Sequence, residues 1–155
     1  MLVRGRGSRY ITIMTSKTHT LKIALAQLNP IVGDVSGNIG LLKQARAEAA
    51  ASGADIVVAS ELFLTGYPPE DLVLKRSFLT RARRMVAMID GGQLYNSVVA
   101  VDDGQMAVRH KHHLPNYAVF DEKRLFHAGP LPAPIELRGV RIGVPICEDI
   151  WFGDV

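Results

Sequence analysis

Cysteine is nearly absent from this 155-residue sequence, and no apolar run approaches the roughly 18 residues of a membrane span. A single cysteine excludes an internal disulfide and fits a reducing compartment, so we expect a cytoplasmic protein without a membrane partner. The sequence also contains only one tryptophan. Its 48% hydrophobic and 21% charged residues are typical of a globular chain of about one domain.

Positive charge in excess is confined to the start of the chain. Residues 1–20 contain four of the 18 basic side chains and no acid, which leaves 14 basic against 15 acidic residues in the remainder. The near-neutral remainder argues against a nucleic-acid partner. We interpret residues 1–20 as a disordered basic leader that contains a candidate true start at Met14, with a transit peptide as the alternative.

Strand and helix patterns alternate along the first half of the sequence. The apolar stretches 21–28 and 56–59 predict buried strands, and residues between them predict a helix that Ser36 or Asn38 caps and Gly53 ends. This order favours an α/β fold with a crossover connection. Further along, residues 75–88 predict a basic helix, for which a solvated face is favoured over phosphate binding. Residues 94–101 and 106–110 predict a hairpin around Asp102-Asp103-Gly104.

The only cysteine follows the apolar run 140–146, which predicts a buried strand. Cys147 is therefore expected at a sheet edge, where a substrate can reach it. The two acids after it disfavour a thiolate, so a nucleophile here needs a base and a cation. The alternative is a small buried hydrophobic residue, which is the role of most free cysteines.

Two other predicted strand ends carry the groups that such a thiol needs. Glu61 follows the strand 56–59 directly, and Lys111 stands where the hairpin ends. Base, cation and nucleophile together indicate a catalytic set, although each residue alone is also a plausible surface side chain. Histidines gather in the segment His110-Lys111-His112-His113, but no second histidine or cysteine pair completes a zinc pattern, so we predict no metal site.

Four sequence blocks resemble the nitrilase, or carbon–nitrogen hydrolase, superfamily, and within it the N-terminal glutamine amidase domain of glutamine-dependent NAD synthetases. These blocks are KIALAQLNPIVGDVSGN (22–38), SELFLTGYPPEDL (60–72), HKHHLPNYAVFDEKRLF (110–126) and GVPICEDIWF (143–152). The resemblance implies the N-terminal part of an α-β-β-α sandwich over residues 21–155.

The resemblance also implies roles for single residues. Glu61 would be the general base, Lys111 the triad lysine and Cys147 the nucleophile that attacks the amide of L-glutamine and forms a thioester. Five further positions would shape the glutamine pocket or brace the triad: Tyr67, Tyr117, Phe120, Glu122 and Glu148. Tyr117 is the strongest candidate for a substrate contact.

What the resemblance implies about partners goes beyond these 155 residues. In the family the ammonia passes to a C-terminal synthetase domain, which uses ATP and Mg to make NAD from nicotinic acid adenine dinucleotide. That domain is absent from this sequence, so we expect no cofactor here, and the resemblance implies a homo-oligomer.

Two departures from the family pattern leave alternatives open. The sequence stops at Val155, so about half of the sandwich is expected to be missing, and residues 89–93 leave no room for a strand that family members carry. The chain could instead be another nitrilase-family amidase or carbamoylase, or an inactive truncated fragment, whose uncovered apolar sheet would promote association.

Overall fold

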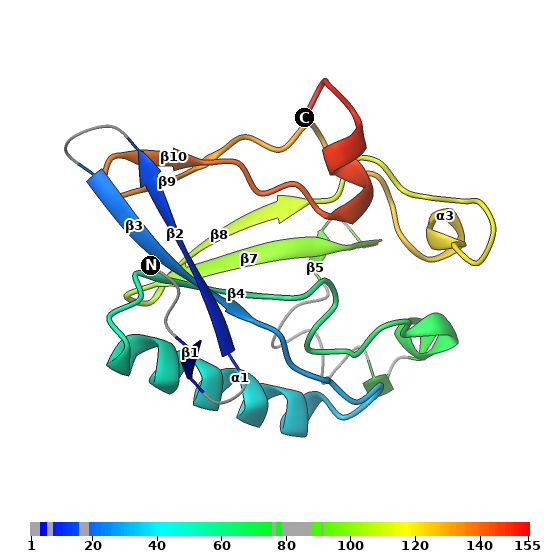
Figure 1. Ribbon diagram of the computed structural model, residues 1–155. Coiled ribbons are helices and arrows are strands. Elements are labelled where there is room, and N and C mark those ends of the chain that lie inside the picture. Colours follow the sequence, from blue (N-terminus) through cyan, green and yellow to red (C-terminus); the bar gives the residue numbers. More distant parts are fainter. Residues whose placement is uncertain (1–3, 6–7, 16–18, 76, 79–87, 91) are drawn as a thin grey trace. The chain divides into compact units, whose positions relative to one another are not determined.

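The structure is a computed structural model that describes residues 4–5, 8–15, 19–75, 77–78, 88–90 and 92–155 (Figure 1). It divides into two compact units, residues 1–67 and 68–155, and each unit is described here by itself. Within the described residues, no helix is both long and apolar enough to cross a membrane.

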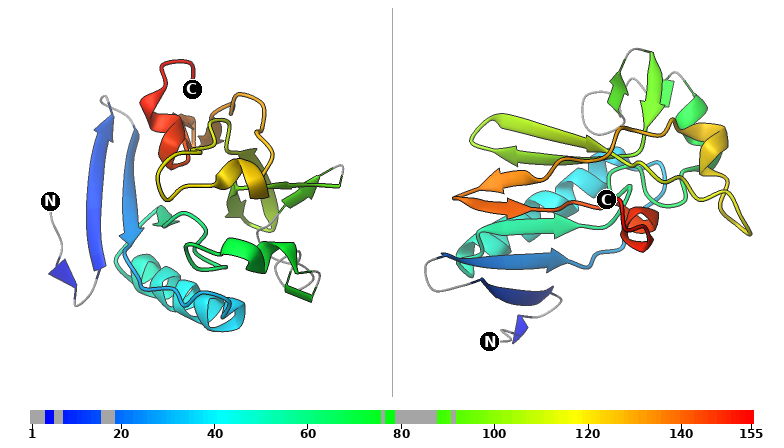
Figure 2. Two further views of the ribbon diagram at one scale, coloured as in Figure 1. Left: turned by 90° about the vertical axis from the view of Figure 1, so that its right-hand side faces the viewer. Right: turned by 90° about the horizontal axis from the view of Figure 1, so that it is seen from above.

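The first unit is built on a sheet with the strand order β1-β2-β3-β4. Its elements are β1 (Arg4–Gly5), β2 (Ser8–Thr15), β3 (His19–Ala26), α1 (Val35–Ala51) and β4 (Ile56–Ala59). β3 and β4 pair in parallel, with Ile23 opposite Ile56 and Ala26 opposite Ala59. Helix α1 connects these two strands and packs against them (Figure 2). This arrangement confirms the crossover and the α/β class predicted from the sequence.

The N-cap of helix α1 lies two residues before the first of the predicted caps. Asp34 is the N-cap, and its Oδ1 accepts the N–H of Gly37 at 2.9 Å. The prediction of Ser36 or Asn38 as the cap was wrong. Asn38 is instead buried, and its side chain hydrogen-bonds the backbone of Ile31 and Leu64, which fixes the loop before the helix. Beyond the helix, Gly53 has a φ of 72° and ends it as predicted.

Part of the expected leader forms a strand. Residues 8–15 make up β2, which pairs antiparallel to β3 from Arg9–Leu25 to Thr15–His19. The prediction of a disordered segment was therefore wrong for these residues. The physical reason is local: the stretch Tyr10-Ile11-Thr12-Ile13 is rich in the aromatic and β-branched residues that favour strands.

The second unit consists mainly of antiparallel hairpins and short helices. The hairpins are β5–β6 (Met88–Asp90, Gln93–Tyr95), β7–β8 (Ser97–Asp102, Gln105–His110) and β9–β10 (Ile135–Leu137, Val140–Ile142). The helices that the structure describes here are η1 (Glu70–Leu74), α3 (Glu122–Leu125) and η2 (Cys147–Trp151). Most of the predicted basic helix, and Gly91 in the short segment 89–93, lie outside the described residues.

Two strand predictions need adjustment in this unit. The β7–β8 hairpin is confirmed, and its turn residues Asp103 and Gly104 both have positive φ, as a type I′ turn requires. The predicted strand 94–101, however, is interrupted at buried Asn96. The predicted strand 140–146 ends at Ile142, because Pro145 cannot donate to a strand ladder and the segment 143–146 runs on without strand pairing.

Candidate active site

Lys111 follows β8 directly and is completely buried, with 0% of its surface exposed. Its backbone N–H donates to the carbonyl of Asn96, and its carbonyl accepts from Gly129, each at 2.8 Å. Its Nζ donates to Oε1 of Glu122, the first residue of α3, at 2.9 Å. A buried ammonium needs such a partner, because desolvation of an unpaired charge is costly. Lys111 is therefore a fixed cation, as the sequence predicts, and Glu122 is an acidic partner that helps to hold it.

Cys147 begins η2 and is exposed. The interpretation of this cysteine as a small buried hydrophobic residue was wrong. Its φ of 45° lies in the left-handed region, which costs a non-glycine residue about 1–2 kcal/mol. Backbone strain of this kind is concentrated at functional sites, where the surrounding structure maintains it. Exposure and strain together support a reactive thiol.

Asp149 is a residue that the sequence analysis missed. It is completely buried, and its Oδ1 accepts the backbone N–H groups of His112 at 3.1 Å and His113 at 2.7 Å. Its Oδ2 accepts the N–H of Ile146 at 3.1 Å. One carboxylate thus ties the segment after Lys111 to the segment that presents Cys147. Position alone gave no signal for this role, because Glu148 and Asp149 both follow the cysteine directly.

Tyr117 and Glu148 are brought together, as the resemblance implies. The Tyr117 hydroxyl donates to Oε2 of Glu148 at 3.0 Å, and the Tyr117 ring meets Phe120 edge-on at 5.6 Å. The pKa of Tyr117 is raised, chiefly by the hydrogen bond to Glu148 and then by desolvation and by the charges of Glu148 and Cys147. The charge of Lys111 lowers this pKa. Tyr117 is therefore within electrostatic range of both Lys111 and Cys147.

The second unit also contains an open cavity of about 740 Å³. Tyr117 and Glu148 form part of its lining, together with His112, His113 and Phe152. A cavity of this size is large enough for an amino-acid ligand. The second unit thus combines a cavity with a hydroxyl and a carboxylate in its wall, a buried cation and an exposed thiol.

Glu61 and Tyr67 lie in the first unit. Glu61 is half-buried in the turn 61–65 that follows β4, so it stands just past a strand end as predicted, and Tyr67 is exposed. Gly66 lets this turn approach the loop before α1: its φ is 76°, and a Cβ there would stand 2.5 Å from the Cα of Val32. Convergence of Glu61 with Lys111 and Cys147 remains a prediction.

Comparison with known proteins identifies the family. The family model for carbon-nitrogen hydrolases matches residues 22–155. The chain belongs to the carbon-nitrogen hydrolase family. This result confirms the resemblance and places the α/β elements described above in the N-terminal part of a nitrilase-type domain.

Among curated proteins, this hydrolase is similar to glutamine-dependent NAD(+) synthetases. It is 42% identical to that of Rhodobacter capsulatus over 156 aligned positions, which cover 89% of this chain and 28% of the relative. It is 40% identical to that of Thermotoga maritima, over 84% of this chain and 26% of the relative. A solved structure of the synthetase from Acinetobacter baumannii, in complex with ADP, is 37% identical with a TM-score of 0.80, covering 84% of this chain and 28% of that one.

The chain thus spans little more than a quarter of the length of these relatives. The alignment with the Rhodobacter protein is also informative within the matched range. Its 156 positions exceed the whole of this chain although only 89% of the chain is aligned. The relative therefore carries residues that this chain lacks inside the matched range.

Proposed function

We propose that this chain is the glutamine-hydrolysing part of a glutamine-dependent NAD synthetase, acting in the cytoplasm. The observation that carries the proposal is the buried Lys111–Glu122 ion pair, in the same unit as an exposed, backbone-strained Cys147. The similarity to the synthetases supports glutamine as the substrate.

The first chemical step is attack by the cysteine. Glu61 takes the proton of the Cys147 thiol, and the sulfur forms a bond to the side-chain amide carbon of glutamine. The amide oxygen becomes an oxyanion, which the Lys111 ammonium and a backbone N–H beside Cys147 stabilise. One donor of this kind contributes about 3–4 kcal/mol to transition-state stabilisation. A lysine held rigidly by Glu122 suits this role, because a preorganised charge needs no reorientation during the reaction.

The second step releases ammonia and the third regenerates the enzyme. The carbon–nitrogen bond breaks as Glu61 returns its proton to the departing nitrogen. A γ-glutamyl thioester on Cys147 remains. Glu61 then removes a proton from water, which attacks the thioester carbon, and glutamate leaves as the thiol is restored.

The polar groups of the cavity would bind the rest of the substrate. Tyr117 and Glu148 offer a hydroxyl and a carboxylate on the cavity wall, and a carboxylate is suited to the α-ammonium group of an amino acid. Phe120 packs edge-on against Tyr117 and supports its orientation. Tyr67, from the first unit, completes the proposed substrate contacts.

The ammonia would serve a linked synthetase domain in a longer protein. That domain would bind ATP and Mg and would use the ammonia in the amidation that yields NAD. The proposed assembly is a homo-oligomer, as the resemblance implies.

A glutamine analogue with an electrophilic carbon in place of the amide tests the proposal. The full 155-residue chain is incubated with the analogue, and its intact mass and peptide map are measured. We expect one adduct, on Cys147, that excess glutamine prevents. Failure of the analogue to react, while iodoacetamide alkylates the same thiol, would reject the proposal.

Matched variants separate catalysis from simple thiol exposure. Glu61→Gln and Lys111→Met should each reduce the rate of labelling by the analogue by at least about a hundredfold, the lower range for an oxyanion donor or a general base. Glu136→Gln, at an exposed position in β9, is the control for loss of a carboxylate and should label like the parent chain. Labelling that survives both triad substitutions would contradict the assigned roles.

Substrate profiling distinguishes glutamine from other amides. The proposal predicts ammonia release from glutamine well above that from short aliphatic amides or N-carbamoyl amino acids. The opposite preference would assign the chain to an aliphatic amidase or carbamoylase instead.

A further inference from the structure

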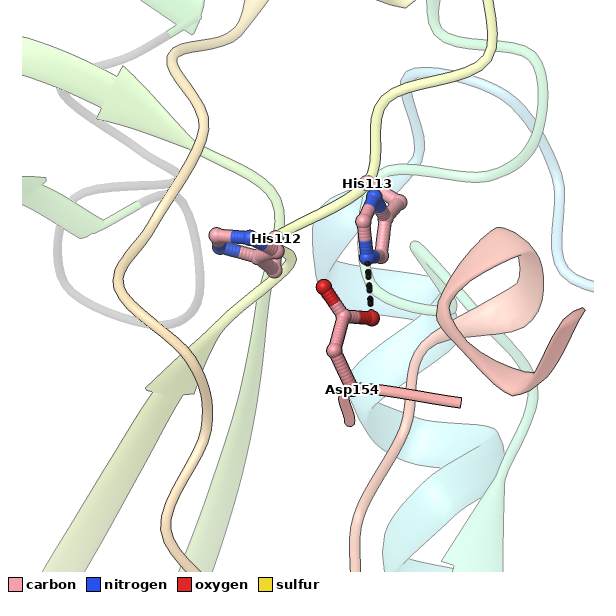
Figure 3. A group of neighbouring side chains, drawn as sticks. All are labelled: His112, His113 and Asp154. Atoms are coloured by element: carbon pink, nitrogen blue, oxygen red, sulfur yellow. Dashed lines mark hydrogen bonds and ion pairs between the residues drawn. The ribbon is translucent and has the colours of Figure 1, made fainter. Parts of the chain in front are cut away.

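Two histidines and an aspartate converge beside the candidate active site (Figure 3). His112 and His113 follow Lys111, and Asp154 lies beyond η2 near the end of the chain. Nε2 of His113 is 2.9 Å from Oδ1 of Asp154. Each of the three residues offers one ligand atom, and these atoms all lie within 4.8 Å of one another.

The two imidazole rings are held in place by other residues. The backbone of both histidines is bound by buried Asp149. Nδ1 of His112 is 2.6 Å from the carbonyl of Gly129. A carbonyl only accepts, so Nδ1 must carry the proton, which leaves the lone pair on Nε2. A hydrogen bond from one ring nitrogen to a carbonyl is the arrangement that orients metal-binding histidines.

The second ring and the carboxylate are also restrained. The ring of His113 stacks on Phe152, with centroids 3.7 Å apart and planes at 14°. The carboxylate of Asp154 is oriented by its hydrogen bond from Nε2 of His113 at 2.9 Å. A metal site needs ligands of this kind, whose orientation is restrained by other contacts.

We propose that His112, His113 and Asp154 bind a divalent transition-metal ion of the zinc type. Two imidazole nitrogens and one carboxylate oxygen are a known zinc ligand set, with a water in the fourth position. Magnesium and calcium are disfavoured, because they prefer oxygen ligands. Zinc holds such ligands at about 2.0–2.2 Å, so its ligand atoms stand roughly 3.3 Å apart. The present ligand atoms lie within 4.8 Å of one another, so binding must draw them together to that spacing, and the ion takes the place of the proton between His113 and Asp154.

The sequence pattern alone argued against this site. Zinc motifs are recognised by two separated pairs of ligands, whereas here the two histidines are adjacent and the third ligand is a single distant aspartate. The fold brings the three ligands together although they are not closely spaced in the sequence, because Asp149 joins the segment of the two histidines to the segment that leads to Asp154. A bound ion would add a second link between them, on the wall of the cavity that Tyr117 and Glu148 also line.

The test is a titration of the full chain, free of any histidine tag, with Zn²⁺ alone. Affinity is measured by competition with a chromophoric chelator, and Co²⁺ is used in parallel because its visible spectrum reports the ligands. We expect one ion per chain and a cobalt spectrum without a thiolate charge-transfer band. Failure to bind either ion would overturn the proposal and leave a His–Asp hydrogen bond as the whole role of the cluster.

Single substitutions identify the ligands. Asp154→Asn is the main variant, because this side chain is 54% exposed and its loss should leave the fold intact, which circular dichroism verifies. We expect Asp154→Asn and His113→Gln to weaken Zn²⁺ binding at least about tenfold, since even outer-shell changes cost that much. His127→Gln, an exposed histidine in the lining of the same cavity, is the matched control and should bind like the parent.

A cysteine variant separates this site from simple thiol binding. Zn²⁺ affinity should be unchanged in Cys147→Ser. Loss of binding in Cys147→Ser, or unchanged binding in Asp154→Asn, would place the ion elsewhere and overturn the proposal.

Discussion

Oδ1 of Asp149 accepts the backbone N–H of His113 at 2.7 Å, and this bond joins two functional segments of the second unit. One segment carries Lys111, and the other begins at Cys147. Asp149 has 0% exposure, so water cannot replace its three backbone bonds. The relative placement of the cation and the thiol therefore depends on an acid that neither reacts nor touches substrate in the proposed mechanism.

The first prediction concerns this acid. Asp149→Asn replaces one carboxylate oxygen with an NH₂ group, which then faces an N–H donor instead of accepting from it. We expect a loss of about 1–3 kcal/mol in the free energy of unfolding, the cost of leaving a buried donor unsatisfied. Chemical denaturation of the full chain measures it, with exposed Glu136→Gln in β9 as the control. A loss below about 0.5 kcal/mol would show that the carboxylate is not needed to join the segments.

The second prediction concerns the Lys111–Glu122 ion pair. Glu122→Gln neutralises the carboxylate that lies 2.9 Å from the buried ammonium, and we expect a destabilisation of about 3–5 kcal/mol. The double variant Lys111→Met, Glu122→Met removes both charges, so it should recover most of that stability. Labelling of Cys147 by the glutamine analogue should not recover. A double variant that labels at the parent rate would show that Lys111 serves only folding.

The strands and the helix were easier to predict from the sequence than the Lys111–Glu122 ion pair. The β3–α1–β4 crossover and the β7–β8 hairpin follow from apolar periodicity and from an Asp-Gly turn, which are local signals. The interruption at Asn96 was not anticipated, because the strand-forming residues continue through it. It results from a non-local change of partner, since Gln93–Tyr95 pair with β5 whereas Ser97–Asp102 pair with β8.

The residues of the candidate site likewise divide into those that local sequence signals predict and those that depend on contacts made by the fold. Cys147 and Lys111 were identified from their positions after strand-like runs and from the family motif. The partner of Lys111 was not derivable from spacing, since it depends on how α3 folds back to bring Glu122 against Nζ. Asp149 was missed for a related reason, because adjacent acids look alike in sequence until burial distinguishes them.

The third prediction tests Tyr117 as a substrate contact. Tyr117→Phe removes the hydroxyl that bonds Glu148 and keeps the ring that packs on Phe120. We expect the KM for glutamine to rise roughly five- to tenfold, the worth of one hydrogen bond, with kcat little changed. Steady-state ammonia release measures both constants. A fall in kcat at constant KM would instead place the hydroxyl in the chemical steps.

The fourth prediction is a pH dependence of the same residue. The hydrogen bond to Glu148 is the main reason that the pKa of Tyr117 exceeds its ordinary 10.0. A raised pKa stabilises the fold while the phenol is protonated. The contribution is therefore complete below pH 10 and is lost as the pH rises through the higher folded value. Ultraviolet titration, with Tyr117→Phe subtracted, should show Tyr117 ionising at lower pH in Glu148→Gln; an unchanged midpoint would refute the assigned cause.

The fifth prediction compares two glycines of the first unit. Gly66 has a φ of 76°, and a Cβ there would stand 2.5 Å from the Cα of Val32, in the loop that precedes α1. Gly40 lies within α1, and a Cβ there meets nothing within 4 Å. Gly66→Ala must distort backbone as well as adopt a left-handed conformation, so we expect a destabilisation above about 2 kcal/mol. Gly40→Ala should stabilise the chain by about 0.5–1 kcal/mol, because alanine restricts the unfolded helix segment.

The two glycine variants are informative because they share one chemical change. If both variants lower the free energy of unfolding equally in chemical denaturation, the close approach of residue 66 to residue 32 does not contribute to stability. Opposite signs, as expected, would establish that the turn holding Glu61 is fixed by this contact and by the hydrogen bond from the Gly33 N–H to the Thr65 carbonyl. In that case Gly66→Ala should also slow the labelling of Cys147 by the glutamine analogue, because the general base depends on that turn for its position.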